Sequence, residues 1–411
     1  MPEGWRIVRL GDVCEAPKYG ASAPAQPFDP NLPRYVRITD ITDDGHLRQT
    51  DTRSANPKRV EGYELETDDL LFARSGSVGR TYRYRQEDGP CVYAGYLIRF
   101  RALNHTAVAR YLELWTRGQF YRSWVTSMLR AGAQPNINAT EYSSLPVALP
   151  PLEEQRAIAE VLDSVDEAIE RAEEVIAATE QLRDALLHEL LTRGLPGQHS
   201  EWKEVPGLGT IPASWTATHL GDVGKFINGR AFKPSDWTDS GLPIIRIQNL
   251  TSRDAPCNFF AGAFDEIHAV DDGDILISWS ASIEVRNWDR GPGILNQHIF
   301  KAISDPRILN HTFMFYLLVA SAHSLRRRVH GTTMQHVTKS TFNSTAIALP
   351  SLEEQRAIAG VLDSVDEAIE LAREELDALR SAQNSISDAL LTGRVRVDPR
   401  REVSHETAGK G

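Results

Sequence analysis

The sequence LEEQRAIAEVLDSVDEAIE at residues 152–170 decides the fold, because it returns as LEEQRAIAGVLDSVDEAIE at residues 352–370. The two copies differ only at Glu160 and Gly360, and they are 200 positions apart. Solenoid repeats recur at a much shorter period of about 20–50 residues. The long spacing therefore indicates two large units, each ending in the same helix.

Both copies open an amphipathic helix of about 40 residues, which at about 1.5 Å per residue is about 60 Å long. A capping box of Ser351 and Glu354 marks the start of the second helix, and Gly194 and Gly393 follow the two helix ends. Apolar residues recur in alternating steps of four and three, the heptad pattern of a coiled coil. The expected seam contains Ile158, Leu162, Val165, Ile169, Ile358, Leu362, Val365, Ile369, Leu376 and Leu379, with Leu182, Leu186 and Leu190 continuing the first stripe.

A narrow seam held over about five heptads needs a partner helix of similar length. This chain carries such a partner, so the favoured hypothesis is an antiparallel coiled coil between its own two helices. Two alternatives stay open. Each helix could pack only on its own domain, or the seams could join separate copies of the chain.

Two globular units of similar plan precede the helices. Their opening segments, WRIVRLGDV and WTATHLGDV, each predict a strand leading into a turn. Further strands are predicted at residues 35–41 and 244–250, and again at 69–75 and 274–280, where each strand enters a Ser/Gly-rich loop. A helix, a Gly-led loop and a last strand then follow in both units, which makes the fold class α+β.

The sequence therefore divides into six segments. They are a globular unit at 1–150, a long helix at 151–193, a linker at 194–210, a second globular unit at 211–350, a second long helix at 351–393, and a partly disordered tail at 394–411.

The net charge of −11 is unevenly distributed. Residues 1–150 contain 19 basic and 17 acidic residues, and residues 201–350 contain 14 of each. The segment 151–200 instead holds 4 basic and 12 acidic residues, and 351–411 holds 8 and 13. Because the acidity lies on the helices, the globular units remain compatible with a basic, nucleic-acid-binding face.

Cysteines and hydrophobic segments indicate a cytoplasmic protein. Cys14, Cys91 and Cys257 are isolated, so neither disulfides nor a zinc site is expected. The start of the chain lacks the basic and apolar regions of a signal peptide. The apolar run at 313–320 is too short to span a bilayer, so no membrane association is expected.

Motifs for common catalysis are absent from the sequence. It has no GxxxxGK[ST] phosphate loop, no HExxH, no GxSxG and no CxxC pair. The segment FAGAF at 260–264 matches only the first part of a methyl-donor loop, and no motif for holding a target adenine follows it. We therefore expect neither a catalytic residue nor a metal site in this chain.

Several polar loops are candidates for DNA contact. Arginine suits phosphate and guanine, amides suit adenine, and hydroxyl groups suit phosphates. None of these loops is specific alone, and each is compatible with an ordinary solvated loop, but they recur at matching places in both units. The candidates are Arg74, Ser75, Ser77, Arg80, Gln134, Asn136 and Asn138 in the first unit, and Arg230, Lys233, Trp279, Ser280, Arg326, Arg327, Arg328, Gln335, His336 and Lys339 in the second.

With the duplicated LEEQRAIA helix, the Trp…Leu-Gly-Asp openings and the loop GTTMQHV in view, the chain resembles the specificity subunit of type I restriction–modification systems. The resemblance implies two target-recognition domains held apart by two helices in an antiparallel coiled coil. It implies that each domain reads one half of an interrupted, asymmetric sequence in double-stranded DNA.

The resemblance also implies the partners. Two adenine methyltransferase subunits would dock on the helices, and motor-nuclease subunits would join them for cleavage. The specificity subunit would itself be non-catalytic, and methyl donor, ATP and Mg would be bound by the partner subunits. Two rival hypotheses are a coiled-coil scaffold that binds only proteins, and a free-standing methyltransferase or nuclease, which the missing motifs disfavour.

Overall fold

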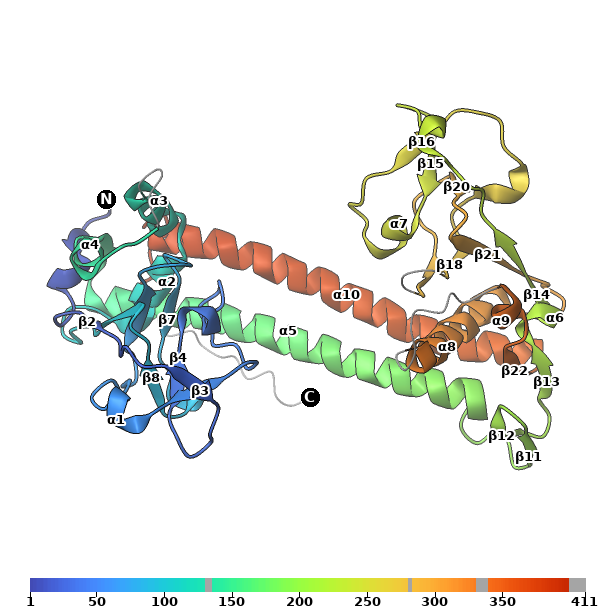
Figure 1. The fold of residues 1–411 in the computed structure, drawn as a ribbon, viewed down its shortest axis with the longest axis horizontal. Coiled ribbons are helices and arrows are strands. Elements are labelled where there is room, and N and C mark those ends of the chain that lie inside the picture. The colour runs from blue at the N-terminus through green and yellow to red at the C-terminus, as the bar shows by residue number, and fades with distance from the viewer. Residues whose placement is uncertain (130–134, 280–282, 330–338, 399–411) are drawn as a thin grey trace. The chain divides into compact units, whose positions relative to one another are not determined.

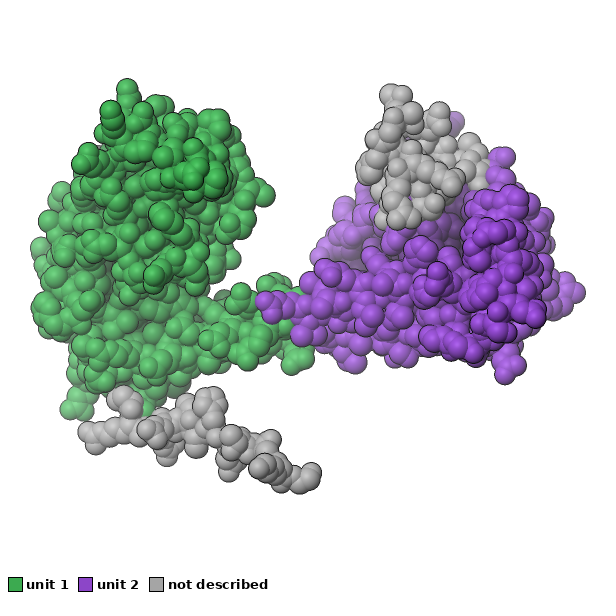
Figure 2. Space-filling view, turned by 90° about the horizontal axis from the view of Figure 1, so that it is seen from below, with its two compact units in different colours: residues 1–173, 375–411 green, residues 174–374 purple. Residues whose placement is uncertain are grey.

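The computed structural model describes residues 1–129, 135–279, 283–329 and 339–398, with the side chains of 324–329, 339 and 341 excepted. Two compact units make up the chain, one of residues 1–173 and 375–411 and the other of residues 174–374 (Figure 2). Helices α5 (Leu152–Arg193) and α10 (Leu352–Leu391) each contribute one part to each unit. Within the described residues, no helix is both long and apolar enough to cross a membrane.

Unit 1 contains two four-stranded sheets, ordered β2-β9-β6-β7 and β3-β5-β4-β8, and a two-stranded pair β1-β10. Its strands are β1 Arg6–Arg9, β2 Lys18–Tyr19, β3 Ala25–Pro27, β4 Arg34–Val36, β5 Arg53–Ala55, β6 Leu70–Ala73, β7 Thr81–Arg83, β8 Cys91–Tyr93, β9 Leu97–Phe100 and β10 Pro146–Leu149. Its shorter helices are η1 Leu10–Asp12, η2 Ile38–Asp40, α1 Pro57–Val60, η3 Gln86–Asp88, α2 Ala109–Arg117, α3 Gln119–Met128 and α4 Ala139–Ser143.

Unit 2 contains sheets ordered β14-β21-β18-β19 and β16-β15-β20-β17, with pairs β13-β22 and β11-β12. Its strands are β11 Trp202–Val205, β12 Gly209–Pro212, β13 Thr216–His219, β14 Gly224–Asn228, β15 Leu242–Ile245, β16 Asn258–Phe260, β17 Ala269–Val270, β18 Ile275–Ser278, β19 Val285–Asn287, β20 Gly293–Leu295, β21 Ile299–Ser304 and β22 Ala346–Leu349. Its shorter helices are α6 Leu220–Val223, η4 Pro234–Asp236, α7 Ile247–Thr251, η5 Glu266–His268, α8 His311–Val329 and α9 Lys339–Asn343.

The two units share most of their topology and differ at the edges of the second sheet, where unit 1 has β3 and unit 2 has β17 (Figure 1). In each unit the first strand pairs antiparallel with the last, Arg6 opposite Leu149 and Thr216 opposite Leu349. Each also has one parallel pair, β4 with β8 and β15 with β20, among otherwise antiparallel neighbours. Mixed sheets with helices placed late in each unit confirm the predicted α+β class.

The long helices pair antiparallel within each unit, as predicted (Figure 1). In unit 1, Ile158 near the start of α5 shares a buried cluster with Leu390 at the end of α10. In unit 2 the roles are exchanged, and Ile358 shares a cluster with Leu187. Both clusters extend into the globular domain, so each domain is built on the helix pair through continuous apolar packing.

The seam follows the expected positions except in the second half of α5. Leu182 is 53% exposed, and Arg183 lies in the seam instead, where its Nε donates to the Asp366 carboxylate at 2.9 Å. An arginine can occupy such a position because its aliphatic stem covers apolar surface while its charged end finds a partner. Among the predicted seam residues, Ile158, Leu162, Ile358, Leu362, Ile369 and Leu376 are buried, and Val165, Ile169, Val365 and Leu379 are half-buried.

Two predicted strands are shorter than expected. The first ends at Val36 and the second at Ile245, and a helical turn follows each. The turn starts because a side chain three residues on accepts from a backbone N–H, Asp40 from Arg37 at 2.7 Å and Asn249 from Arg246 at 3.0 Å. The predicted linker at 194–210 also differs, since it contains β11 and the start of β12.

Candidate nucleic-acid interface

The second glutamate of each LEEQ motif binds the opening tryptophan of the same unit. Glu154 accepts a hydrogen bond from the Trp5 indole at 3.1 Å, and Glu354 accepts one from Trp215 at 3.0 Å. A basic side chain that follows the other helix completes each contact. Arg396 donates to both oxygens of Glu154 at 2.6 and 2.8 Å, and His199 lies 2.7 Å from Glu354. The repeated Trp and Glu therefore join the domain to the helix pair.

The glutamine of each LEEQ motif is fully buried and holds the start of a domain helix. The Gln155 amide accepts from the Val108 N–H at 2.8 Å and donates to the Pro150 carbonyl at 2.9 Å. Gln355 accepts from Asn310 at 2.7 Å and donates to Pro350 at 3.0 Å. The amide thus satisfies backbone groups that would otherwise be buried without a partner.

The second aspartate of each DSVD motif connects the domain to the opposite long helix. Asp166 accepts from Arg110 at 2.7 Å and also from Gln383 of α10. Asp366 accepts from Tyr316 at 2.9 Å and from Arg183 of α5 at 2.9 Å. Gln383 and Arg183 occupy matching positions in the two helices, 200 residues apart.

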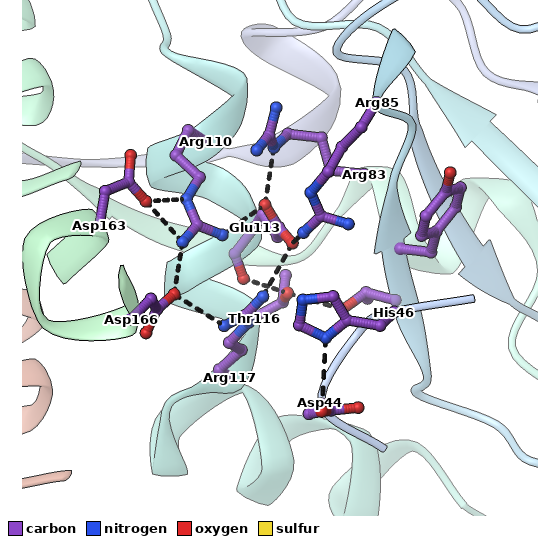
Figure 3. Close-up of polar contacts among 12 residues, drawn as sticks. Asp44, His46, Arg83, Arg85, Arg110, Glu113, Thr116, Arg117, Asp163 and Asp166 are labelled. Atoms are coloured by element: carbon purple, nitrogen blue, oxygen red, sulfur yellow. Dashed lines mark hydrogen bonds and ion pairs between the residues drawn. The ribbon is translucent and has the colours of Figure 1, made fainter. Parts of the chain in front are cut away.

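A buried ion network fixes α2 to α5 in unit 1 (Figure 3). Its centre is Glu113, which is fully buried. Burial alone would raise the pKa of this carboxyl, but the surrounding guanidinium groups, Arg110 foremost, lower it to about 2. Arg110 also reaches Asp163 at 2.6 Å, so the network extends onto the repeated helix. The other arginines around Glu113 are Arg83, Arg85 and Arg117, at 2.7–2.9 Å from the carboxylate.

Another group of repeated residues lies on the exposed side of the long helices, where the ion pairs that its members form are with residues three or four positions away on the same helix. Five positions of the duplicated stretch are exposed in both copies and identical: Glu153/Glu353, Arg156/Arg356, Ser164/Ser364, Glu167/Glu367 and Glu170/Glu370. We call them the repeated helix face. Steps of three or four residues join most of them into one stripe along the helix. Because exposed positions tolerate many residues, internal packing does not explain why these five are the same.

In unit 1 the structure brings together some of the predicted DNA-contacting residues. The Arg74 guanidinium lies 4.8 Å from the centre of the Tyr19 ring, and its Nε donates to Asn136 at 3.4 Å. Arg74 also donates its backbone N–H to the carbonyl of Tyr96, a side chain that is 64% exposed. We call these four residues the Arg74 patch. Ser75 pairs with Asn136 in an isolated bridge, and Ser77 is exposed in the adjoining loop.

Two other predicted residues of unit 1 are engaged within the protein. Arg80 forms an ion pair with Asp43 at 2.7 Å and donates to the Ile41 carbonyl. Asn138 caps α4, where its side chain accepts from the Glu141 N–H at 2.9 Å. A short polar loop in sequence does not reveal such uses, because they depend on neighbours elsewhere in the fold.

In unit 2 the matching place is built from different residues. Trp279 follows β18 as Arg74 follows β6, and the backbone N–H of Trp279 donates to the backbone carbonyl of His298 at 3.3 Å. Arg230 lies 4.6 Å from the Phe260 ring centre and accepts at its carbonyl from the Gln297 N–H at 2.8 Å. We call Arg230, Trp279, Gln297 and His298 the Trp279 patch. Lys233 is exposed nearby, and its backbone N–H donates to Asp236.

The remaining predicted DNA-contacting residues lie outside the described part of the chain, wholly or at their side chains. Gln134, Ser280, Gln335 and His336 are outside the described residues, whereas Arg326, Arg327, Arg328 and Lys339 belong to helices whose side chains at those positions are not described.

Sequence reasoning missed the two aromatic residues of the Arg74 patch and the turn that carries Gln297. The missing signal is an alignment of YAGYL at 93–97 with LNQHI at 295–299, which becomes visible once β8 and β20 are matched. A close contact between two backbone segments, present at the same place in both units, supports this match. A Cβ on Gly20 would lie 2.3 Å from the Ala94 carbonyl oxygen, and one on Gly229 would lie 2.1 Å from that of Asn296.

Comparison with known proteins identifies the family. A family model for the type I restriction modification DNA specificity domain matches residues 2–180 and 212–381. The putative type I restriction enzyme MjaX specificity subunit of Methanocaldococcus jannaschii is 27% identical, over 97% of this chain and 95% of its own length. The MjaVIII specificity subunit of the same organism is 25% identical, over 97% and 94%.

Solved structures share the fold. The S subunit of a type I restriction–modification system from M. genitalium matches with a TM-score of 0.56 at 14% identity, covering 94% of this chain and 96% of its own. A chain from a study of complex assembly and conformational transition in the type I R-M system matches with a TM-score of 0.61 at 21% identity, covering 96% and 99%. Together with the two matched domain repeats, these findings place the chain in the family of type I restriction–modification specificity subunits, which recognise DNA targets.

Proposed function

We propose that this chain reads an interrupted, asymmetric DNA sequence, with each unit binding one half, and that its long helices dock two adenine methyltransferase subunits. One contrast carries the proposal. At matching places the two patches differ, with Trp279 in place of Arg74 and His298 in place of Tyr96, whereas the repeated helix face is identical in both copies. Different readers suit two different half-sites, and identical exposed faces suit two copies of one partner.

The chemistry of the patches supports DNA reading. Arg74, Asn136 and Tyr19 bring a guanidinium, an amide and an aromatic ring together in unit 1. Arg230, Gln297 and Trp279 supply the same kinds of group from neighbouring backbone segments of unit 2. Guanidinium groups contact guanine or phosphate, and amides contact adenine. Because the residues differ, we expect the two half-sites to differ in sequence.

The other parts of the proposal follow from the family. The chain would be non-catalytic, and methyl donor, ATP and Mg would belong to the methyltransferase and motor-nuclease subunits. We place the assembly in the cytoplasm, where its DNA lies.

Selection from a random duplex library with the purified full-length chain tests DNA reading. We expect two short sets of fixed bases separated by a constant gap, with affinity that falls as salt rises. Absence of any salt-sensitive DNA affinity, even with the methyltransferase present, would leave the protein-binding scaffold as the better description.

Native mass spectrometry with the methyltransferase subunit tests docking. Wild type should bind two copies. Arg156→Glu should lose one copy and the Arg156→Glu/Arg356→Glu double variant both, because each reverses a charge on the repeated helix face. Arg193→Glu is the matched control, since Arg193 is exposed at the end of the same helix, pairs with Glu189 outside the repeated helix face, and is replaced by Gly393 in the other copy. Two bound copies in the double variant would exclude the repeated helix face as the docking surface.

A further inference from the structure

Unit 2 contains a cavity of about 230 Å³ beside the Trp279 patch. We call it the Gln297 pocket. Three segments form it: the loop after β14, the turn from β15 into α7, and the turn between β20 and β21. Its lining residues are Phe232, Trp237, Ile244, Arg246, Ile247, Gln248, Asn296, Gln297 and His298. The volume is several times the roughly 30 Å³ that one water occupies in the liquid, so it has room for a larger group.

The pocket exists because one large side chain of unit 1 is replaced. Strand pairing matches Tyr35, opposite Val92, with Ile244, opposite Ile294. Tyr35 is 3% exposed, and its hydroxyl lies 2.8 Å from the Ala21 carbonyl oxygen. Isoleucine has neither the ring nor the hydroxyl, so unit 2 lacks the group that occupies this place in unit 1.

The lining matches a flat heterocycle with polar edges. Trp237 and Phe232 supply aromatic faces, and the Arg246 guanidinium lies 5.8 Å from the Trp237 ring centre. Asn296, Gln297 and Gln248 supply amides. Extruded nucleobases are held by this combination of aromatic stacking and hydrogen bonds to the base edge.

One buried polar atom in the lining also lacks a partner. Within the described residues, His298 Nδ1 is buried without a hydrogen bond. Its other nitrogen, Nε2, lies 3.2 Å from the Gln297 amide nitrogen. If that amide donates to Nε2, then Nδ1 carries the proton and needs an acceptor. Buried polar groups are nearly always satisfied, so the vacant donor indicates a ligand with acceptor atoms, such as the ring nitrogen or carbonyl oxygen of a base.

We propose that the Gln297 pocket receives a nucleobase of the DNA target that has left the base stack, so that unit 2 reads one position of its half-site by capture. The inference rests on the proposed function, because a DNA target is its premise. The source could also be a free nucleotide, but the adjoining Arg230 and Trp279 favour DNA. The corresponding place in unit 1 holds Tyr35, so capture is confined to one half-site.

Mispairing in the DNA target tests the capture. Once the site is known, the full-length chain without methyltransferase is titrated with duplexes that carry one mispair at each position in turn. At a single position of the unit 2 half-site, a mispair should tighten binding at least about tenfold, because the mispaired base no longer has to be unpaired before capture. No mispair in the unit 1 half-site should do so.

Two variants locate the effect. Ile244→Tyr places in the pocket the residue that unit 1 carries, and it should abolish the mispair effect while binding to the other positions persists. Gln297→Ala should reduce discrimination at the same position, and it is the safer variant for folding because Gln297 is only half-buried. Gln198→Ala, outside the pocket lining, is the control and should change nothing.

The outcomes separate this inference from the proposed function. Specific binding to two half-sites with no mispair effect anywhere would overturn capture and leave DNA reading in place. Loss of all sequence-specific binding in the wild type would overturn both. Quenching of tryptophan fluorescence by free adenosine or guanosine monophosphate, abolished in Ile244→Tyr, without any mispair effect would identify a nucleotide site and also overturn capture from DNA.

Discussion

Single residues of the duplicated helix divide into those that hold the fold together and those that face solvent. Glu154, Gln155 and Asp166 have counterparts with equivalent roles in unit 2, and each contacts a segment far away in sequence. Their identity in both copies follows from shared architecture. Residues such as Arg156 and Glu167 are also identical between the copies but are exposed, so internal packing does not account for their identity, whereas the proposed docking of two copies of one partner would.

Glu113 should make the stability of unit 1 depend on pH. Its folded pKa of about 2 is lower than its ordinary value of 4.5. A depressed carboxyl pKa stabilises the folded state fully above pH 4.5, and this contribution is lost as the pH falls toward 2. A shift of this size corresponds to about 3 kcal/mol.

Urea unfolding of wild type and Glu113→Gln at several pH values measures the effect. We expect the variant to be less stable by about 3 kcal/mol at pH 7, with the difference shrinking below pH 4.5. Glu160→Gln, a change at an exposed glutamate, should leave stability unaltered at every pH. A difference that stays constant down to pH 2 would contradict the assigned ion network.

Arg74 and Arg80 form a second test at residue scale, because they lie in one loop but have different surroundings. Arg74→Ala should weaken DNA binding roughly tenfold and reduce the slope of log affinity against log salt by about one, as expected for the loss of a phosphate contact. Arg80→Ala should leave DNA binding nearly unchanged, since Arg80 already pairs with Asp43. Salt titrations of both variants on the same duplex decide the matter, and equal losses would refute the distinction.

Among the elements, the two long helices are matched by charge as well as by apolar packing. Glu173 of α5 pairs with Arg380 of α10 at 2.7 Å in unit 1, and Glu180 pairs with Arg373 at 2.6 Å in unit 2. Residues 173 and 373 occupy the same position of the two repeats, and so do residues 180 and 380. Each ion pair is therefore the other one with the two helices exchanged. If α5 paired in this antiparallel register with α5 of a second molecule, Glu173 would face Glu180. If α10 paired with α10 of a second molecule, Arg373 would face Arg380. The charges therefore favour the pairing of α5 with α10.

Charge reversal tests this matching. Arg373→Glu/Arg380→Glu should lower the free energy of unfolding by roughly 1–2 kcal/mol, because each half-exposed pair contributes up to about 1 kcal/mol and becomes repulsive. Adding Glu173→Arg/Glu180→Arg should restore most of the loss. The deficit, followed by circular dichroism, should diminish in 1 M salt. Failure of the fourfold variant to recover would show that the pairs do not act together.

At the scale of the whole molecule, the proposed function assigns the helices a role in setting the gap between half-sites. Seven residues added to both α5 and α10 at opposed points preserve the heptad and lengthen each helix by about 10 Å. At about 3.4 Å per base pair, the selected gap should grow by about three base pairs. Selection from random duplexes with the lengthened chain measures the gap, with insertions of seven residues in the 399–411 tail as the control. An unchanged gap would remove the helices as the determinant of spacing.

The amino-acid sequence alone determined the duplicated helix and the α+β plan of both units, because these depend on periodicity and repetition that are visible in one dimension. It favoured pairing of the two helices within the chain, and its repeated motifs carried the resemblance to the family. It misjudged the seam near Arg183 and the ends of two strands, where a side chain's partner lies on another element. Only the tertiary structure decided which loop residues are available. Arg74 and Arg80 look alike in sequence, yet one lies on Tyr19 and the other is paired with Asp43. Availability depends on neighbours brought together by folding, and local sequence does not encode them.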